Sequence, residues 1–256
     1  MSIASSTYCS LTLNTDKADT TPEISSEIFP QSRIISKVLS PAVRLWLRSQ
    51  VEQVSNLEVK ISGSDRSLLA GQIPCISISA TRAVYQGLHL SQLRLVGQNI
   101  CINLGQVLQG KPLRLLEPVP VSGELRLQES DLNISLRSPL LAEALTELLT
   151  TLLPTTYTED RQVSCHKINI NNAQLIINAT LATDTINPKP VVISTGLQLA
   201  SCHELQLAQP QIQTQGEFSS LNLDNFKLDL GKEVDIQELT LVSGELICRG
   251  RINVLP

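Results

Sequence analysis

The sequence predicts an α+β fold in which curved, mostly antiparallel β-sheets wrap around two long apolar helices. Two observations carry most of this prediction. A Ser-Pro pair opens an apolar helical segment at Ser40 and again at Ser138, and serine can cap a helix while proline suits its first turn. After each segment come runs in which apolar and polar residues alternate, a period that is typical of half-buried strands with short connections.

A repeated pentapeptide is the third observation. Val-Ser-Gly-Glu-Leu occurs at Val121–Leu125 and again at Val242–Leu246. Together with the two helix-plus-strand units, the repeat indicates an internal duplication with halves 32–137 and 138–256. A match of five residues also arises by chance, because Gly-Glu-Leu is common where a turn enters a strand, so both interpretations stand.

The first helix is predicted to begin at Ser32 or Ser40 and to end near Val54. Its apolar positions follow helical spacing and form one stripe of Leu39, Val43, Trp46, Leu47, Val51 and Val54. A charged strip recurs every four residues and contains Arg44, Arg48 and Glu52. More than half of the circumference of this helix is therefore apolar.

The second helix is predicted over Pro139–Leu153, and Pro154 ends it. One half of its surface is apolar and contains Leu141, Leu145, Leu148, Leu149 and Leu152. The other half is polar and contains Glu143, Glu147 and Thr150. A helix in a closed core needs an apolar stripe only about 100° wide, so both helices have a surplus of apolar surface.

About a dozen strands are predicted from the alternation of residue types along the chain. The alternation slips by one residue near Ser91 and Gln92, where a β-bulge would bend the sheet. The run from Leu132 to Leu136 also alternates, and we expect it to form a hairpin strand after a turn at Glu129-Ser130.

Composition narrows the class of function. The chain has 256 residues, a net charge of -4 and only 3% aromatic residues. Nucleic-acid binding is not expected, because it normally combines a cationic groove with stacking rings. No stretch approaches the roughly 20 apolar residues of a transmembrane helix. Residues 1–31 show no secretory signal and are expected to form a disordered polar tail before a domain of residues 32–256. We therefore expect a cytoplasmic protein with reduced cysteines.

Catalytic and metal-binding motifs are poorly represented. The tripeptide Ser-Cys-His occurs at Ser164–His166 and at Ser201–His203, but adjacent residues of a strand point to opposite faces. On this geometry His166 shares a face with Ile168, and the cysteines and histidines cannot readily converge on one zinc ion. The spacings of calcium loops, nucleotide-binding loops and serine hydrolases are absent. We expect a non-enzyme with no metal and no cofactor.

The apolar surplus of the helices leaves two interpretations open. It is either packed between sheets or it lines a groove for acyl chains. For a groove, the helix faces supply Val43, Trp46, Leu47, Val51, Leu141, Leu145, Leu148 and Leu152. The candidates for contact with a phosphate headgroup are Arg44, Arg48, Lys111 and Arg114. The alternative for each of these side chains is ordinary solvation.

Several stretches of the sequence resemble one known family. They are Ser40–Arg48, Arg82–Leu88, Asn103–Leu116, Ser138–Leu141 and Leu223–Gly231. These stretches resemble the sequences of the LmeA-type phospholipid-binding proteins, which are common in photosynthetic bacteria. The resemblance extends over about residues 34–256. It implies phospholipid binding and kinship with tubular lipid-binding folds, in which a curved sheet wraps a long helix. It implies no particular functional residues.

The sequence therefore predicts a soluble or peripheral membrane protein that binds phospholipid, or another long-chain amphiphile, in an apolar groove. Transfer of the lipid between membranes is an extension of this prediction, and the expected partners are phospholipid or a membrane surface. The alternative is a non-catalytic structural module whose sheet edges recruit a protein partner. A lipid hydrolase is a weaker hypothesis, because no nucleophile with a base in reach can be assembled.

Overall fold

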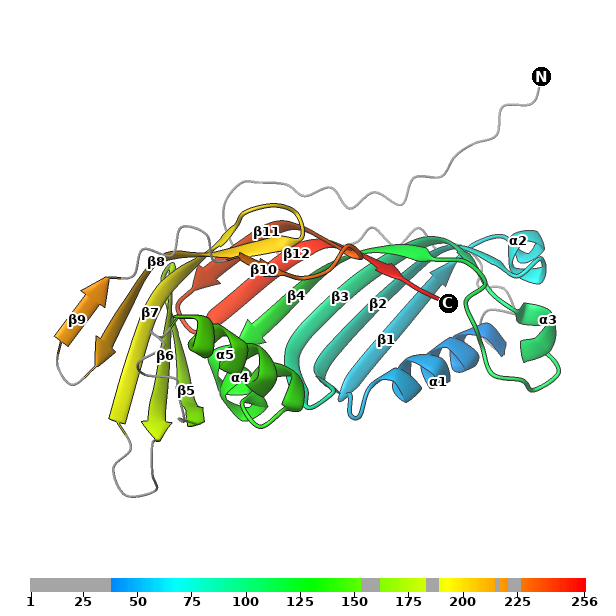
Figure 1. The fold of residues 1–256 in the computed structure, drawn as a ribbon. Coiled ribbons are helices and arrows are strands. Elements are labelled where there is room, and N and C mark those ends of the chain that lie inside the picture. Colours follow the sequence, from blue (N-terminus) through cyan, green and yellow to red (C-terminus); the bar gives the residue numbers. More distant parts are fainter. Residues whose placement is uncertain (1–37, 153–161, 183–188, 215–216, 221–226) are drawn as a thin grey trace.

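Two antiparallel β-sheets dominate the computed structural model, which describes residues 38–152, 162–182, 189–214, 217–220 and 227–256 (Figure 1). Sheet 1 has the order β1-β2-β3-β4-β12-β11, and its strands are β1 (Asn56–Ser62), β2 (Gln72–Tyr85), β3 (Leu88–Cys101), β4 (Val119–Gln128), β11 (Val234–Val242) and β12 (Glu245–Val254). Sheet 2 has the order β10-β8-β7-β6-β5, with β9 paired to β8. Its strands are β5 (Gln162–Asn171), β6 (Gln174–Ala182), β7 (Lys189–Leu199), β8 (Glu204–Thr214), β9 (Glu217–Ser220) and β10 (Lys227–Asp229). The expected tail of residues 1–31 lies outside the described residues.

The helices of the described residues are short and cover parts of the sheets. They are α1 (Ser40–Gln50), α2 (Asp65–Leu69), α3 (Leu104–Val107), α4 (Glu129–Ser135) and α5 (Pro139–Leu152). The predicted α+β class, with sheets wrapped on two long helices, is wrong, because strands predominate and the longest helix has 14 residues. In Figure 1, α1 and the pair α4 and α5 lie on the same side of sheet 1 instead of forming an axis for it.

The first helix is shorter than predicted because the chain after it pairs with a strand. α1 ends at Gln50, and the Glu52 N–H then donates to the Val84 carbonyl at 2.8 Å. The Val84 N–H donates to the Gln53 carbonyl, also at 2.8 Å. These bonds satisfy backbone groups that a longer helix would have paired internally. The second helix begins as predicted, since Ser138 Oγ accepts the Leu141 N–H at 3.1 Å.

The segment predicted as a hairpin strand is the helix α4. Its apolar residues alternate, but its polar side chains pair with the edge of β5. Asn133 Nδ2 donates to the Ile168 carbonyl at 2.7 Å, and Asn133 Oδ1 accepts the Ile168 N–H at 2.8 Å. The Glu129 carboxylate accepts the Ile170 N–H at 2.7 Å. α4 thus takes the place of a neighbouring strand for sheet 2.

α4 also holds the beginning of β3, so it joins the two sheets. Ser135 Oγ accepts the His89 N–H at 2.8 Å. Ser91 Oγ donates to Asp131 Oδ2 at 2.6 Å and accepts the N–H of Gln128, the last residue of β4, at 2.7 Å. A seven-residue helix therefore bonds to the two strands β3 and β5, and these bonds explain why the alternating segment is not itself a strand.

The bulge predicted near Ser91 and Gln92 is wrong. The pairing of β2 with β3 keeps one register from Gln72↔Cys101 to Tyr85↔Leu88, so no residue is inserted. The ladder is interrupted instead at Arg82, opposite Ser91, where the backbone is left-handed with a φ of 50°.

The repeated pentapeptide adopts two different conformations. Val121–Leu125 is extended within β4, whereas Val242–Leu246 forms the turn from β11 to β12, with a φ of 78° at Gly244. The two copies do not occupy equivalent positions in two similar units. Duplication of the chain stays a prediction.

The apolar core is divided into two buried clusters beneath sheet 1. The first packs α1 against β1 and β2, together with α2 and α3, and includes Leu39, Val43, Val59, Ile61, Leu68, Ile76 and Leu104. The second packs α4 and α5 against sheet 1 and sheet 2 and includes Leu127, Leu132, Leu145, Leu149, Ile168, Ile177, Ile193 and Leu241. Because each helix group covers only part of sheet 1, the face between and beyond them is available for other contacts.

Candidate functional site

Apolar side chains form three rows across the whole width of sheet 1. Directly paired residues of neighbouring strands share a face. The first row contains Leu57, Ala80, Leu93, Leu125, Cys248 and Leu239. The next two rows on the same face contain Val59, Ile78, Leu95, Gly123, Gly250 and Ile236, and then Ile61, Ile76, Gly97, Val121, Ile252 and Val234. Both buried clusters contact this face, which we call the inner face.

Part of the inner face belongs to neither buried cluster. At the β1 side, Val59 and Ile61 are buried under α1. Farther across the sheet, seven apolar side chains on β3, β11 and β12 are half-buried or exposed and lie outside both clusters. We call them the apolar strip, and they are Leu93, Leu95, Val234, Ile236, Leu239, Cys248 and Ile252. Apolar side chains gathered on one face of a sheet and left partly uncovered are typical of a site that contacts another apolar molecule.

Gly123 and Gly250 leave the middle of the inner face without side chains. The two glycines pair directly across β4 and β12. A Cβ added to Gly123 would lie 2.5 Å from Leu95 Cδ2 and 2.8 Å from the Arg94 carbonyl oxygen. Leu95 therefore leans over Gly123, and the glycine is required for this close packing within the strip.

The outer face of sheet 1 is polar and is held together by an ion network. Glu124 accepts hydrogen bonds from Arg126 Nε and Arg249 Nε, each at 2.7 Å, and Arg249 also donates to Glu238 at 2.7 Å. Burial alone would raise the pKa of Glu124, but the hydrogen bonds from the two arginines outweigh it and hold the pKa below its usual value. Sheet 1 is therefore amphipathic, with its apolar contacts on the inner face.

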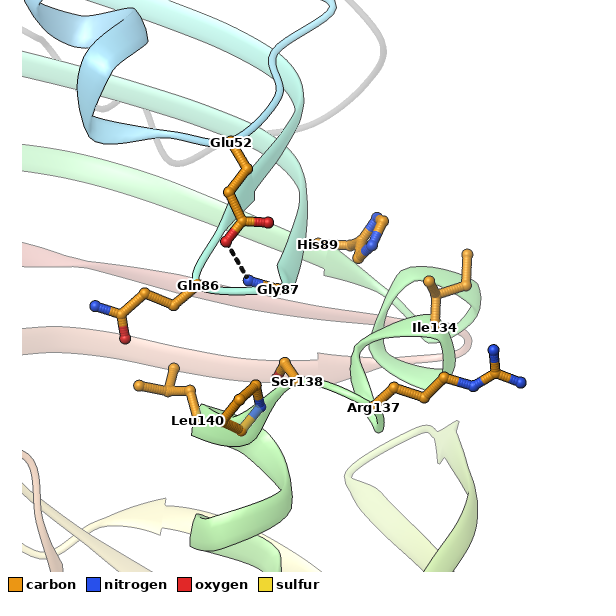
Figure 2. A pocket seen from close by; sticks show the side chains of 9 residues that line it. Glu52, Gln86, Gly87, His89, Ile134, Arg137, Ser138 and Leu140 are labelled. Atoms are coloured by element: carbon orange, nitrogen blue, oxygen red, sulfur yellow. Dashed lines mark hydrogen bonds between the residues drawn. The ribbon is translucent and has the colours of Figure 1, made fainter.

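A cavity of about 640 Å³ lies where α4 and α5 meet the turn between β2 and β3 (Figure 2). It is lined by Glu52, Gln86, Gly87, His89, Ile134, Arg137, Ser138, Pro139 and Leu140. Pockets for small ligands commonly enclose about 300–1,000 Å³, so the volume suits part of a ligand molecule. The lining combines one carboxylate, one guanidinium and one imidazole with exposed apolar side chains, a mixture that suits the polar end of an amphiphile.

Gly87 closes one wall of this cavity. Its φ is 74°, and its N–H donates to Glu52 Oε1 at 3.1 Å. A Cβ at this position would lie 2.9 Å from Ser138 Cβ, so the turn approaches the start of α5 only because the residue is glycine. Figure 2 shows the Glu52 carboxylate directed at Gly87, while the Arg137 side chain extends away from it.

A smaller cavity of about 190 Å³ lies between α5 and β5. It is lined by Leu136, Ala142, Leu145, Thr146, Leu149, Ser164 and Cys165. Burial raises the pKa of the Cys165 thiol to about 11, so this thiol is a weak nucleophile at neutral pH.

The residues predicted for a groove lie mainly in the two packed clusters. Val43 is 4% exposed and Leu145 is 7% exposed, although Leu145 also lines the smaller cavity. The half-buried members that pack against the clusters are Trp46, Leu47, Leu141 and Leu148. Val51 is half-buried just after α1, and Leu152 is in α5 with its side chain outside the described part. Their contact with lipid stays a prediction.

The four predicted headgroup cations are exposed and lie in two separate places. Arg44 and Arg48 are on α1, whereas Lys111 and Arg114 lie between α3 and β4. The two described cavities are not lined by any of them. Arg137, which lines the larger cavity, was not among the predicted cations. It directly precedes the Ser138-Pro139 helix start, and this position could have indicated it.

The two Ser-Cys-His tripeptides are not arranged as the strand parity predicted. A register shift in β5 lies between Cys165 and Lys167, so Cys165 packs half-buried against the second cluster and His166 is exposed. The prediction that His166 shares a face with the buried Ile168 is therefore wrong. In the second tripeptide, Cys202 Sγ lies 3.5 Å from Nδ1 of the adjacent histidine. Within the described ranges, no three His, Cys, Asp or Glu side chains are grouped as metal ligands would be.

Comparison with known proteins identifies the family. A protein-family model described as LmeA-like phospholipid-binding matches residues 31–251. The chain belongs to the LmeA-like phospholipid-binding family. The match confirms the resemblance seen in the sequence, and it extends over both sheets of this LmeA-like protein. Searches of curated proteins and of solved structures return no match, so kinship with tubular lipid-binding folds stays a prediction.

The family supports phospholipid as the class of ligand for this LmeA-like protein. In the part of the chain that the structure describes, the helices are too short or too polar to cross a bilayer.

Proposed function

We propose that this LmeA-like protein binds phospholipid with its acyl chains on the apolar strip and transfers the lipid between membranes as a peripheral protein. The observation that carries the proposal is the set of apolar side chains on β3, β11 and β12 that no helix of the described residues buries. Covering this surface with an acyl chain contributes about 0.8 kcal/mol for each buried methylene group. The proposed role contains no catalytic step.

The larger cavity supports a place for the polar end of the same lipid. His89 lines the cavity and lies four residues before Leu93 on β3. At about 3.3 Å per residue, roughly 13 Å separate the two positions along the strand. A lipid with its headgroup beside Glu52 and Arg137 would lead its chains toward the strip along β3.

Recruitment of a protein partner by the free edge of sheet 1 is less well supported. β1 is one of the two edge strands, and Glu58 and Lys60 form an exposed ion pair of 3.2 Å on it. On β11, the other edge strand, the Ile236 N–H donates to the Cys202 carbonyl and the Leu241 carbonyl accepts the Ala173 N–H. Charged side chains on an edge strand normally prevent the addition of a further strand. The structural-module alternative therefore has no specific observation in its favour.

Paired substitutions on β11 test the proposed function. Leu239→Asn places an amide on the inner face, and Thr240→Asn places the same amide on the outer face. Native mass spectrometry of protein purified from cells should show bound phospholipid in the wild type and in Thr240→Asn, with a strong reduction in Leu239→Asn. Transfer of a labelled phospholipid between vesicles should follow the same order. If the wild type carries no lipid and accepts none from vesicles, the proposal is wrong.

A further inference from the structure

Leucine side chains protrude at one end of sheet 1. Leu69 is 60% exposed, Leu108 57%, Leu116 59% and Leu255 59%. Leu69 is the last residue of α2, Leu108 follows α3, Leu116 precedes β4 and Leu255 follows β12. Figure 1 shows α2 and α3 at the same end of the sheet. Their neighbours Leu68, Leu104 and Leu113 are buried in the first cluster. The chain thus separates buried from exposed leucines within each segment, and the exposed ones are available to a partner.

Backbone contacts bring these segments together. The Ile102 N–H donates to the Gly71 carbonyl at 2.8 Å, which joins the end of α2 to the start of α3. The Leu116 N–H donates to the Cys101 carbonyl at 2.9 Å. Val254 pairs with Val119, so the last residues of β12 lie beside the first residues of β4.

A buried asparagine fixes the loop between α3 and β4. Asn103 is 9% exposed, and its Oδ1 accepts the Arg114 N–H at 2.8 Å. Its Nδ2 donates to the Pro112 carbonyl and to Gln106 Oε1, each at 3.0 Å. These hydrogen bonds hold the loop that contains the exposed Leu108 and Leu116. We call this end of the sheet the leucine tip and define it by Leu69, Leu108, Leu116 and Leu255.

Exposed cations accompany the leucine tip. Arg66, Lys111 and Arg114 are all exposed and take part in none of the ion pairs between described residues. Over α2 and the loop between α3 and β4, the sequence contains these three cations and two acids, Asp65 and Glu117. Glu117 accepts a hydrogen bond from the Cys101 thiol. Cations therefore outnumber acids by one in these two segments, in a chain whose net charge is -4.

We propose that the leucine tip docks on the surface of an anionic phospholipid bilayer. The leucines enter the boundary between headgroups and acyl chains, and the three cations meet lipid phosphates. This inference rests on the proposed function, since it identifies the surface through which lipid would be collected and delivered. It also gives Lys111 and Arg114 a role with membrane headgroups instead of the headgroup of a bound lipid.

Vesicle sedimentation tests the proposal with matched variants of the full chain. The wild type should bind vesicles that contain phosphatidylglycerol at least tenfold more strongly than vesicles of phosphatidylcholine alone. The double variant Leu69→Ser and Leu108→Ser should bind the anionic vesicles at least tenfold more weakly. Lys111→Glu with Arg114→Glu should remove the preference for anionic vesicles. The control Leu45→Ser changes the most exposed leucine of the described residues, at 73%, which lies on α1, and should bind as the wild type does.

The same variants separate this proposal from the proposed function. Tip variants should retain bound phospholipid in native mass spectrometry, because the apolar strip is unchanged. Loss of vesicle binding with retained lipid supports the tip. Sedimentation of the tip variants equal to that of the wild type overturns it, as does an equal loss in Leu45→Ser or equal binding of the wild type to both kinds of vesicle. If no variant and no wild-type protein carries lipid while tip-dependent sedimentation persists, docking holds and the carrier role fails.

Discussion

Replacing Asn133 by alanine should destabilise the protein, because one side chain of α4 serves as the neighbour of β5. The substitution removes two hydrogen bonds to Ile168, at 2.7 and 2.8 Å. Each contributes about 1 kcal/mol, and the N–H of Ile168, whose side chain is buried, loses its partner at an additional cost. We expect the free energy of unfolding to fall by about 2–3 kcal/mol, which corresponds to a decrease in Tm of about 4–10 °C.

Urea denaturation followed by circular dichroism measures this change, and Ser130→Ala is the matched control. Ser130 is exposed on the same helix, so its replacement should alter stability by no more than about 0.5 kcal/mol. Hydrogen exchange should also accelerate at the Ile168 amide in Asn133→Ala. If Asn133→Ala is as stable as the control, α4 does not substitute for a strand and the account of how the sheets are joined is wrong.

Further predictions concern the ion network, the glycine and the cysteines. Glu124→Gln should lower stability by about 1–2 kcal/mol at neutral pH. Because the Glu124 pKa is lowered in the folded protein, this difference should be complete above pH 4.5 and shrink as the pH falls through the lowered pKa; a constant difference from pH 7 to pH 3 would contradict it. Gly123→Ala should cost about 1–3 kcal/mol in urea denaturation, because its Cβ meets Leu95, whereas unchanged stability would show that the strip can repack. Iodoacetamide at pH 8 should modify the exposed Cys202 first and Cys165 slowly, with the Cys165 rate rising about tenfold per pH unit since its pKa is about 11; equal rates by mass spectrometry would oppose this.

Local sequence patterns predicted the strands well where one face of a sheet is buried. Leu239 and Leu241 alternate with polar residues, which is typical of one shared face, and the register of β11 with β12 puts both on the inner face. The cap at Ser138 was also readable, because its bond to Leu141 is made within a single turn. These features depend on residues close together in the chain.

Features that depend on distant residues could not be read in this way. α4 alternates like a strand, and its bonds to β3 and to the edge of β5, where Ile168 is 35 residues after Asn133, explain why it is a helix. The wide apolar faces of α1 and α5 left open whether they line a groove or pack against sheets. Val43 and Leu145 are buried in two separate clusters, and contact of the helix faces with lipid stays a prediction. Each helix packs against more than one neighbour, and a single stripe does not reveal this.

The candidate site required the register of six strands. Cys248 and Leu93 lie far apart in the sequence, and both pair with Leu125 across sheet 1. The larger cavity similarly joins Glu52, which follows α1, to Arg137, which precedes α5. The spacing of residues within one segment cannot predict contacts between distant segments. The apolar strip and the larger cavity therefore follow from the topology.

Alkylation of Cys248 tests most directly the claim that phospholipid covers the apolar strip. Cys248 lies in the strip, whereas Cys202 is exposed elsewhere and serves as an internal reference in the same chain. At one fixed pH, lipid-loaded protein should react with a maleimide at Cys248 at least tenfold more slowly than delipidated protein, with the Cys202 rate unchanged. Equal Cys248 rates in the two states would contradict the account, because the bound lipid would then lie elsewhere.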